Sequence, residues 1–275
     1  MTQFIAHGGA LFAALLLATA ATGATAATTT YTTSLAKAPL DQVQKQAEAG
    51  DGTAQLELGH RYYYDKALKD DKKALEWFQK AADQHVGWAE YEAATMYENG
   101  EGTAPDPQRA LGLYQAAATD GVVRADADLG LMYLEGDGAP KDIVQAVKWL
   151  QAGAAADEPR AEYLLAILYR DGQGVDQDYG KARTLFRASA AQRFAAAAYG
   201  LGDLIKQGKG GDKDLVEGQA WRIMGKYLEA PRMPNGGQVV GAVLVSPDLT
   251  KAQNDAAETR YFQLMDELGF SKTGR

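Results

Sequence analysis

The sequence predicts an all-α fold, in which about five helix-turn-helix repeats stack into a solenoid with a capping helix at each end. Alanine and leucine, which favour helix, supply much of the apolar content, and β-branched residues are sparse. Side-chain types also recur every 35 or 36 residues along most of the chain. A period of that length is typical of stacked helix pairs, each of which buries its apolar face only against its neighbours.

The first 26 residues read as a secretory signal peptide. Ala10–Ala20 is an uncharged apolar run, and Ala24-Thr25-Ala26 supplies the small-x-small cleavage pattern, so we expect cleavage after Ala26. The run is too short to anchor the chain in a bilayer. An uncleaved apolar helix is the alternative. Residues 27–35 are rich in threonine and predict a disordered spacer.

The solenoid is predicted over residues 36–230. Residues 36–49 form a first capping helix, and the five repeats cover 49–84, 85–120, 121–156, 157–192 and 193–230. In repeats two to five a Gly-x-Gly turn follows the first helix, because glycine adopts the left-handed conformation that a helix C-terminus needs, whereas repeat one has Tyr64-Asp65-Lys66-Ala67 there instead. An aspartate then caps the second helix. The members of four series keep this register: Tyr62, Tyr97, Tyr133, Tyr169; Ala54, Ala89, Ala125, Ala161, Ala197; Ala74, Ala110, Ala146, Ala182; and Asp70, Asp106, Asp142, Asp178, Asp214.

The last part of the chain departs from the repeat. Residues 231–248 carry a turn signal followed by a β-branched apolar run, which predicts a loop or short hairpin. We expect it to fold across the last repeat or, alternatively, to pair with a strand of a partner. Residues 249–275 predict a second capping helix, over Lys251–Leu268, and a tail.

The repeat pattern resembles the Sel-one-like repeat (SLR) family, a relative of the tetratricopeptide repeats. The residues of the third repeat that carry the resemblance are Ala125, Leu129, Gly130, Tyr133, Gly136, Gly138, Asp142, Ala146, Trp149, Ala154 and Ala155. The resemblance implies a right-handed α/α superhelix whose first helices line the concave surface. It also implies adaptor and binding roles, such as those of periplasmic regulators, host-interaction factors and immunity proteins that neutralise toxic enzymes. The chain has no cysteine and so departs from the cysteine-rich members associated with penicillin binding.

Acidic residues on the first helices are the candidate binding residues. If these helices line the concavity, the acids form a lining suited to a basic partner segment, whereas the alternative is a solvated helix face. Three share one repeat position, three share a second position two residues earlier, and two lie seven residues beyond the first position on the same helical face. In that order the eight are Glu57, Glu92, Asp128, Glu90, Asp126, Glu162, Glu135 and Asp171.

The function predicted is therefore a periplasmic or secreted module that binds another protein, either as a regulator or as a toxin-neutralising immunity protein. The net charge of −8 and the lack of a basic stripe argue against nucleic acid. Beyond the signal segment the histidines are His60 and His85, and neither has a partner at ligand or triad spacing in the sequence. We expect no cofactor, no metal and no catalysis. The alternative is a cell-wall- or β-lactam-processing enzyme, which would need a general acid/base pair.

Overall fold

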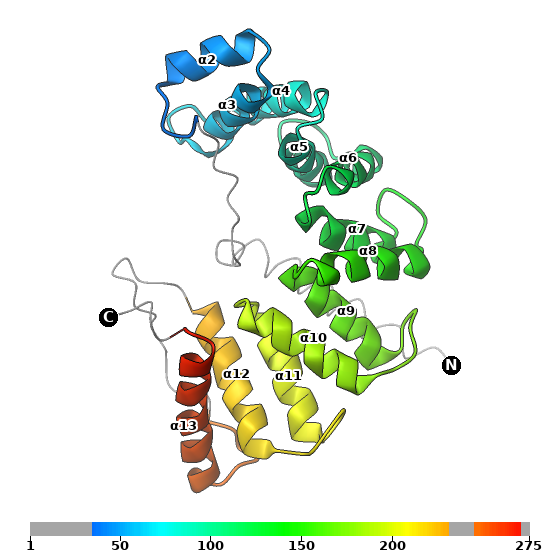
Figure 1. The fold of residues 1–275 in the computed structure, drawn as a ribbon, viewed down its shortest axis with the longest axis vertical. Coiled ribbons are helices and arrows are strands. Elements are labelled where there is room, and N and C mark those ends of the chain that lie inside the picture. The colour runs from blue at the N-terminus through cyan, green and yellow to red at the C-terminus, as the bar shows by residue number, and fades with distance from the viewer. Residues whose placement is uncertain (1–34, 231–244, 271–275) are drawn as a thin grey trace. The chain divides into compact units, whose positions relative to one another are not determined.

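The computed structural model describes residues 35–230 and 245–270, and in them the chain forms helices α2 to α13 (Figure 1). The predictions for residues 1–34 and 231–244 lie outside this range. The described residues divide into two compact units, 35–185 and 186–270, and the helix α10 contains the division. The bounds of the helices are α2 Leu40–Glu48, α3 Gly52–Tyr64, α4 Asp71–Ala82, α5 Gly87–Asn99, α6 Pro107–Thr119, α7 Arg124–Glu135, α8 Ile143–Ala155, α9 Pro159–Asp171, α10 Tyr179–Ala191, α11 Ala195–Gln207, α12 Leu215–Glu229 and α13 Lys251–Glu267.

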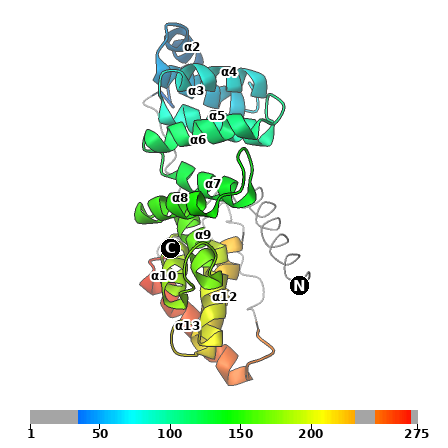
Figure 2. The ribbon, with the colours of Figure 1, turned by 90° about the vertical axis from the view of Figure 1, so that its right-hand side faces the viewer.

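Helix pairs are the building unit of residues 35–185. The pairs α3–α4, α5–α6 and α7–α8 follow one another in chain order (Figure 2), and each first helix packs most closely on its own second helix. The two alanine series face these contacts, since every member is fully buried. The predicted all-α superhelical repeat fold is confirmed.

The two glycines in the turns of repeats two, three and four have separate roles. The first, such as Gly136 with φ of 79°, ends the first helix in the left-handed conformation. The second, such as Gly138, lies against the preceding repeat, where an added Cβ would come within 2.3 Å of the carbonyl oxygen of Pro107. Only glycine lets the two backbones approach this closely. The second glycine is thus a stacking residue between repeats.

The aspartates that precede the second helices cap them as predicted. The Asp106 carboxylate accepts a hydrogen bond of 3.0 Å from the Arg109 backbone N–H, and the other members of the series make the equivalent bond. Each bond satisfies a backbone donor at the helix N-terminus that has no partner within the helix.

The links between repeats contain a backbone feature that the sequence pattern did not reveal. One residue per link has a positive φ, and the five are Gly50, His85, Gly121, Asp157 and Arg193. They are spaced by 35 or 36 residues. Three of these positions therefore hold side chains in a conformation that favours glycine.

Helix α2 covers the start of the array, inside the predicted range 36–49. Val43 and Ala47 pack against Ala54 and Leu58 of α3. Arg61 of α3 donates to the backbone carbonyl oxygens of Ala36 and Ala38, at 2.8 and 3.2 Å. These bonds hold the segment before α2 on the first repeat.

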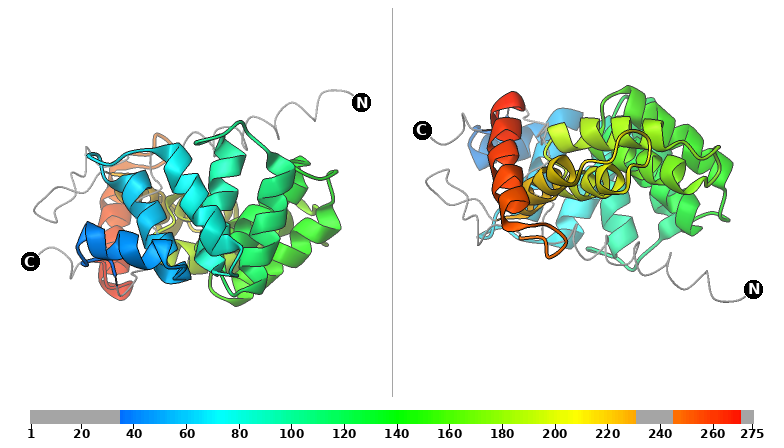
Figure 3. Two further views of the ribbon diagram at one scale, coloured as in Figure 1. Left: turned by 90° about the horizontal axis from the view of Figure 1, so that it is seen from above. Right: turned by 90° about the horizontal axis from the view of Figure 1, so that it is seen from below.

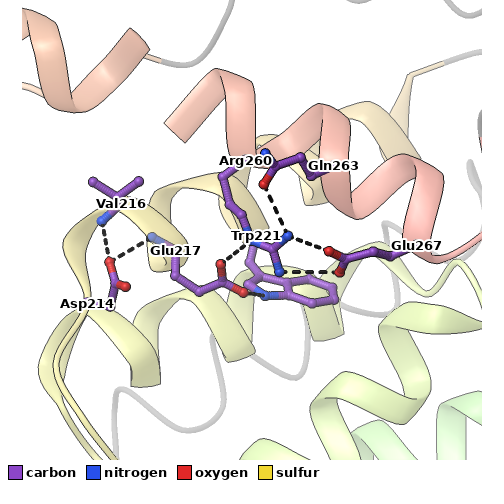
Figure 4. A network of polar contacts seen from close by, with 7 residues as sticks. All are labelled: Asp214, Val216, Glu217, Trp221, Arg260, Gln263 and Glu267. Carbon is purple, nitrogen blue, oxygen red and sulfur yellow. Dashed lines mark hydrogen bonds and ion pairs between the residues drawn. The ribbon is translucent and has the colours of Figure 1, made fainter. Parts of the chain in front are cut away.

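Helix α13 lies alongside α12 in residues 186–270 (Figure 3, right). Figure 4 shows how charged groups join them: Arg260 of α13 pairs with Glu217 of α12 at 2.6 Å, and Glu217 also accepts a hydrogen bond from the Trp221 indole. Thr250 begins α13 with a capping box. No helix in the described ranges is long and apolar enough to cross a membrane.

Candidate binding face on the first helices

The first series of predicted acids is tied internally rather than presented to solvent. Glu57 accepts from Arg61 at 2.7 Å, and Glu92 lies 3.3 Å from His60 of the preceding repeat. Asp128 accepts a 3.0 Å hydrogen bond from the Tyr91 hydroxyl.

Arg160 of α9 completes this set, because it pairs with the same Asp128 carboxylate. Asp128 of α7 thereby joins Tyr91 of α5 to Arg160, and three successive first helices are linked through one carboxylate. Glu92 and Asp128 therefore tie neighbouring repeats together, whereas Glu57 pairs within α3.

The second series lies in the first turns of its helices and is buried. Glu90, Asp126 and Glu162 are 2%, 9% and 3% exposed. Burial raises the pKa of Asp126 to about 6. The positive end of the helix dipole partly offsets the cost of burying a carboxylate there.

Five of the eight predicted acids thus differ from the expected open lining. Glu57, Glu90, Asp126, Asp128 and Glu162 are all at most 9% exposed, so none of them presents its charge to a partner in this structure. The physical reason is that these positions face the neighbouring helices, which supply hydrogen-bond donors or cover them. Glu92 is half-buried, and only Glu135 and Asp171 are exposed.

Three acids lie where the first helices end, and of these Glu135 is exposed while Glu98 and Asp137 are half-buried. Glu98 belongs to the last turn of α5, Glu135 ends α7, and Asp137 is the middle residue of the next Gly-x-Gly turn. We call Glu98, Glu135 and Asp137 the acidic edge. Asp171 ends α9 in the same way, but its carboxylate is held by Arg170 through two hydrogen bonds of 2.7 Å.

Negative charges gather at the acidic edge. Burial and then the neighbouring Asp137 raise the pKa of Glu135, although Arg160 and Lys141 act against this. Burial, Asp128 and Asp137 likewise raise the pKa of Glu98, which accepts a 2.7 Å hydrogen bond from the Tyr114 hydroxyl. The contribution of Asp137 to both shifts indicates a negative potential at this edge.

Two tyrosines lie at the end of α3, near Glu101. Tyr64 is 63% exposed and packs edge-on against Tyr63, with ring centroids 4.7 Å apart. The Tyr63 hydroxyl donates a 2.5 Å hydrogen bond to Glu101, just beyond α5. Tyrosine is a residue type enriched in protein interfaces.

A family model, described as the Sel1 repeat, matches residues 52–86, 89–122, 123–158, 159–194 and 195–221. These segments cover more than half of the chain and coincide with the helix pairs described above. The chain belongs to the Sel1 repeat family. The resemblance drawn from the third repeat is confirmed.

Two solved Sel1-type structures are similar to this chain. A protective antigen of uropathogenic Escherichia coli that displays an SLR fold is 34% identical, with a TM-score of 0.64, over 66% of this chain and 39% of its own. A Sel1 repeat protein from Oxalobacter formigenes is 31% identical, with a TM-score of 0.62, over 68% of this chain and 54% of its own.

A curated relative matches a shorter stretch. The secretory immunoglobulin A-binding protein EsiB of Escherichia coli O6:H1 is 41% identical over 49 residues, which are 18% of this chain and 10% of EsiB. The chain therefore spans about half or less of the length of each of these three relatives.

A regular spacing could have revealed the ties within the Sel1 repeats. The pairs His60–Glu92 and Asp128–Arg160 are both separated by 32 residues, which is one repeat less one helical turn. In stacked pairs of period 36, that offset places two side chains on facing turns of neighbouring first helices. Charge pairs at this offset are the signal that simple repeat alignment overlooked.

The end of the 231–248 segment lies on the last repeat. Ser246 Oγ is 3.2 Å from Lys206 Nζ of α11, and the Asn254 amide holds the Ser246 backbone at 2.9 Å. Residues 245–248 line a cavity of about 390 Å³ together with Asp203, Lys206, Gln219 and Arg222. The cavity is open and polar, and Arg222 already pairs with Asp203 across it.

Proposed function

We propose that this chain is a protein-binding module whose acidic edge and exposed Tyr64 contact a basic segment of a partner protein. The observation that carries the proposal is the gathering of Glu98, Glu135 and Asp137, where Asp137 adds to burial in raising the pKa of both glutamates. A partner's lysine or arginine would relieve this repulsion and speed association. The buried acids of the same helices serve to hold the repeats in register.

The family supports a protein as the ligand. Sel1 repeats build a rigid array of helix pairs, and such arrays offer extended side-chain surfaces that suit macromolecular partners. EsiB, with which the chain shares 49 aligned residues, is described as binding secretory immunoglobulin A. Identification of the captured partner distinguishes an immunoglobulin-like ligand from a toxin or a membrane sensor.

The proposed role involves no catalysis. His60, the histidine on this face, is held between Glu92 and the ring of Phe78, with ring centroids 5.3 Å apart. Its position suits a tie between repeats better than a general base, which must reach a substrate proton.

The proposed site of action is the periplasm or the cell exterior, reached through cleavage after Ala26. The test is the intact mass of the protein recovered from the periplasm or medium of the expressing bacterium. A mass that begins at Ala27 supports export with cleavage, and full-length protein in the cytoplasm would contradict it.

Affinity capture tests the binding role. The purified chain is the bait for periplasmic and culture extracts, and captured proteins are identified by mass spectrometry. The variant Glu135→Lys with Asp137→Lys reverses the acidic edge, and lysine at a helix C-terminus is compatible with folding. The matched control, Glu76→Lys with Asp83→Lys, reverses two exposed acids on or just beyond α4.

The expected result is a protein that the wild-type chain and the control capture and the edge variant loses. A captured toxin supports the immunity role, and a captured membrane sensor supports the regulatory role. Capture by all three chains alike would remove the acidic edge from the binding surface.

A further inference from the structure

Three side chains that can bind a metal meet at the two ends of the second repeat. His85 lies in the link before α5, Glu90 lies in the first turn of α5, and Asp120 follows the end of α6. One donor atom from each lies within 4.8 Å of the other two. Local sequence spacing does not reveal this grouping, because Asp120 is 35 residues from His85 and only repeat stacking brings them together.

One carboxylate oxygen of Glu90 is buried without a hydrogen bond within the described ranges and is available to bind a metal ion. The residue is 2% exposed, and its Oε2 atom is buried without a hydrogen-bond partner among the described residues. Its other oxygen, Oε1, is 3.6 Å from His85 Nδ1, beyond ordinary hydrogen-bond length. A buried carboxylate oxygen left without a donor is costly, and in native proteins such an atom calls for an explanation.

The side chains of His85 and Asp120 have room to move toward the buried Glu90 oxygen. The His85 side chain is 85% exposed, and Asp120 is exposed as well. Asp120 lies against the N-terminus of α5, since a Cβ added to Gly87 would come within 2.9 Å of the Asp120 Cβ. A four-coordinate ion with bonds of about 2.0–2.2 Å needs its ligands roughly 3.4 Å apart, so rotation of His85 and Asp120 is enough.

The backbone at His85 has the positive φ that is shared by all five links. Its φ is 57°, in the region where glycine is favoured and where Gly121 stands in the next link. A histidine held in this conformation costs stability unless its side chain gains something in return.

We propose that His85, Glu90 and Asp120 form a binding site for one divalent transition-metal ion, of which Zn²⁺ fits best. One imidazole and two carboxylates match the nitrogen and oxygen ligands that Zn²⁺ accepts, and a fourth position is left for water. The hard ions Ca²⁺ and Mg²⁺ prefer oxygen donors only. The ion would clip the link before α5 to the end of α6 and so fasten the second repeat.

Zn²⁺ titration of the chelator-treated chain by calorimetry tests the site. The expected result is one saturable Zn²⁺ site, together with a rise in the unfolding temperature when the ion is added. Co²⁺ is the second probe, because its visible absorption reports the nitrogen and oxygen ligands directly.

Two variants test whether these residues bind the ion. His85→Asn removes the imidazole but keeps a residue that tolerates the left-handed conformation. Asp120→Asn changes an exposed residue and serves if the first variant misfolds. Either change is expected to lower Zn²⁺ affinity at least about tenfold, which is the lower bound even for groups that only support metal ligands.

His60→Asn is the matched control, because His60 pairs with Glu92 outside the cluster. It is expected to bind Zn²⁺ as the wild-type chain does. The proposal is overturned if the wild-type chain has no saturable site, or if His85→Asn and His60→Asn bind Zn²⁺ equally.

Discussion

Replacing Gly138 by alanine tests whether the second turn glycine joins neighbouring repeats. Two features of the structure make this change destabilising. The backbone φ is 72°, which costs a side chain about 1–2 kcal/mol, and the new Cβ would lie 2.3 Å from the carbonyl oxygen of Pro107. Because the obstacle is helix backbone, it cannot rotate aside, and relieving the overlap costs about 1–3 kcal/mol more.

Gly121 provides the matched control. It has a φ of 85°, and an added Cβ there would meet nothing within 4 Å. Gly121→Ala therefore carries the backbone penalty alone, about 1–2 kcal/mol. We expect Gly138→Ala to lower the free energy of unfolding by about 2–5 kcal/mol in all, and the difference between the two variants measures the stacking contact.

A third variant grades the effect by the nature of the obstacle. At Gly174 the new Cβ would meet the Ile143 side chain at 2.4 Å, and a side chain can move. Gly174→Ala is therefore expected to fall between the other two. Urea unfolding followed by far-ultraviolet circular dichroism gives the midpoints and slopes for all three. Equal destabilisation by Gly138→Ala and Gly121→Ala would refute the stacking role.

Three further predictions concern buried charge and the links. Asp126→Asn should stabilise the chain by about 1–2 kcal/mol at about pH 7.5 and by little near pH 4, as measured in paired thermal melts. Burial raises the pKa of Asp126 in the folded chain to about 6, above its ordinary value, so ionisation of this carboxyl costs stability as the pH rises through about 6. A gain that is equal at both pH values would contradict this. Asp157→Gly should stabilise by up to about 1 kcal/mol, because Asp157 is exposed with a φ of 57°; urea midpoints that do not rise would show that the link conformation carries no strain. Arg160→Met should destabilise by about 2–3 kcal/mol by leaving Asp128 buried and unpaired, and adding Asp128→Asn should restore most of the loss; additive losses in this double-mutant cycle would disprove the tie.

The repeat fold was predictable because its signals are local. Gly136 ends a helix through its own φ, and Asp142 begins the next through a hydrogen bond to a residue three positions on. The buried alanines, such as Ala125 and Ala146, follow from the same period. Each of these effects depends on neighbours in the sequence, so periodicity was sufficient.

The candidate site was less predictable because its contacts cross repeats. Glu57 and Asp128 share a repeat position with Glu92, and periodicity alone does not distinguish a solvated face from a row of ties. The distinction depends on partners such as His60 and Arg160, which lie 32 residues away on another helix. Burial by a facing helix is a property of the stacked array and not of the local pattern.

The metal cluster was missed for the same reason. His85 has an acid five residues on, at Glu90, which is not a spacing that marks a metal site. Asp120 joins them only because the start and the end of one repeat meet in space. A search of the sequence at an offset of about one repeat would have paired His85 with Asp120, which are 35 residues apart.

The most direct test of the account is the affinity of the captured partner, purified, for the wild-type chain and its two charge-reversed forms, measured by calorimetry at low and high salt. We predict that Glu135→Lys with Asp137→Lys weakens binding by about tenfold or more at low salt, and that this loss of affinity shrinks at high salt. The control Glu76→Lys with Asp83→Lys is expected to bind the partner like the wild type. Equal affinity of the edge variant and the wild type, at both salt concentrations, would contradict the claim that this Sel1 repeat protein binds through its acidic edge.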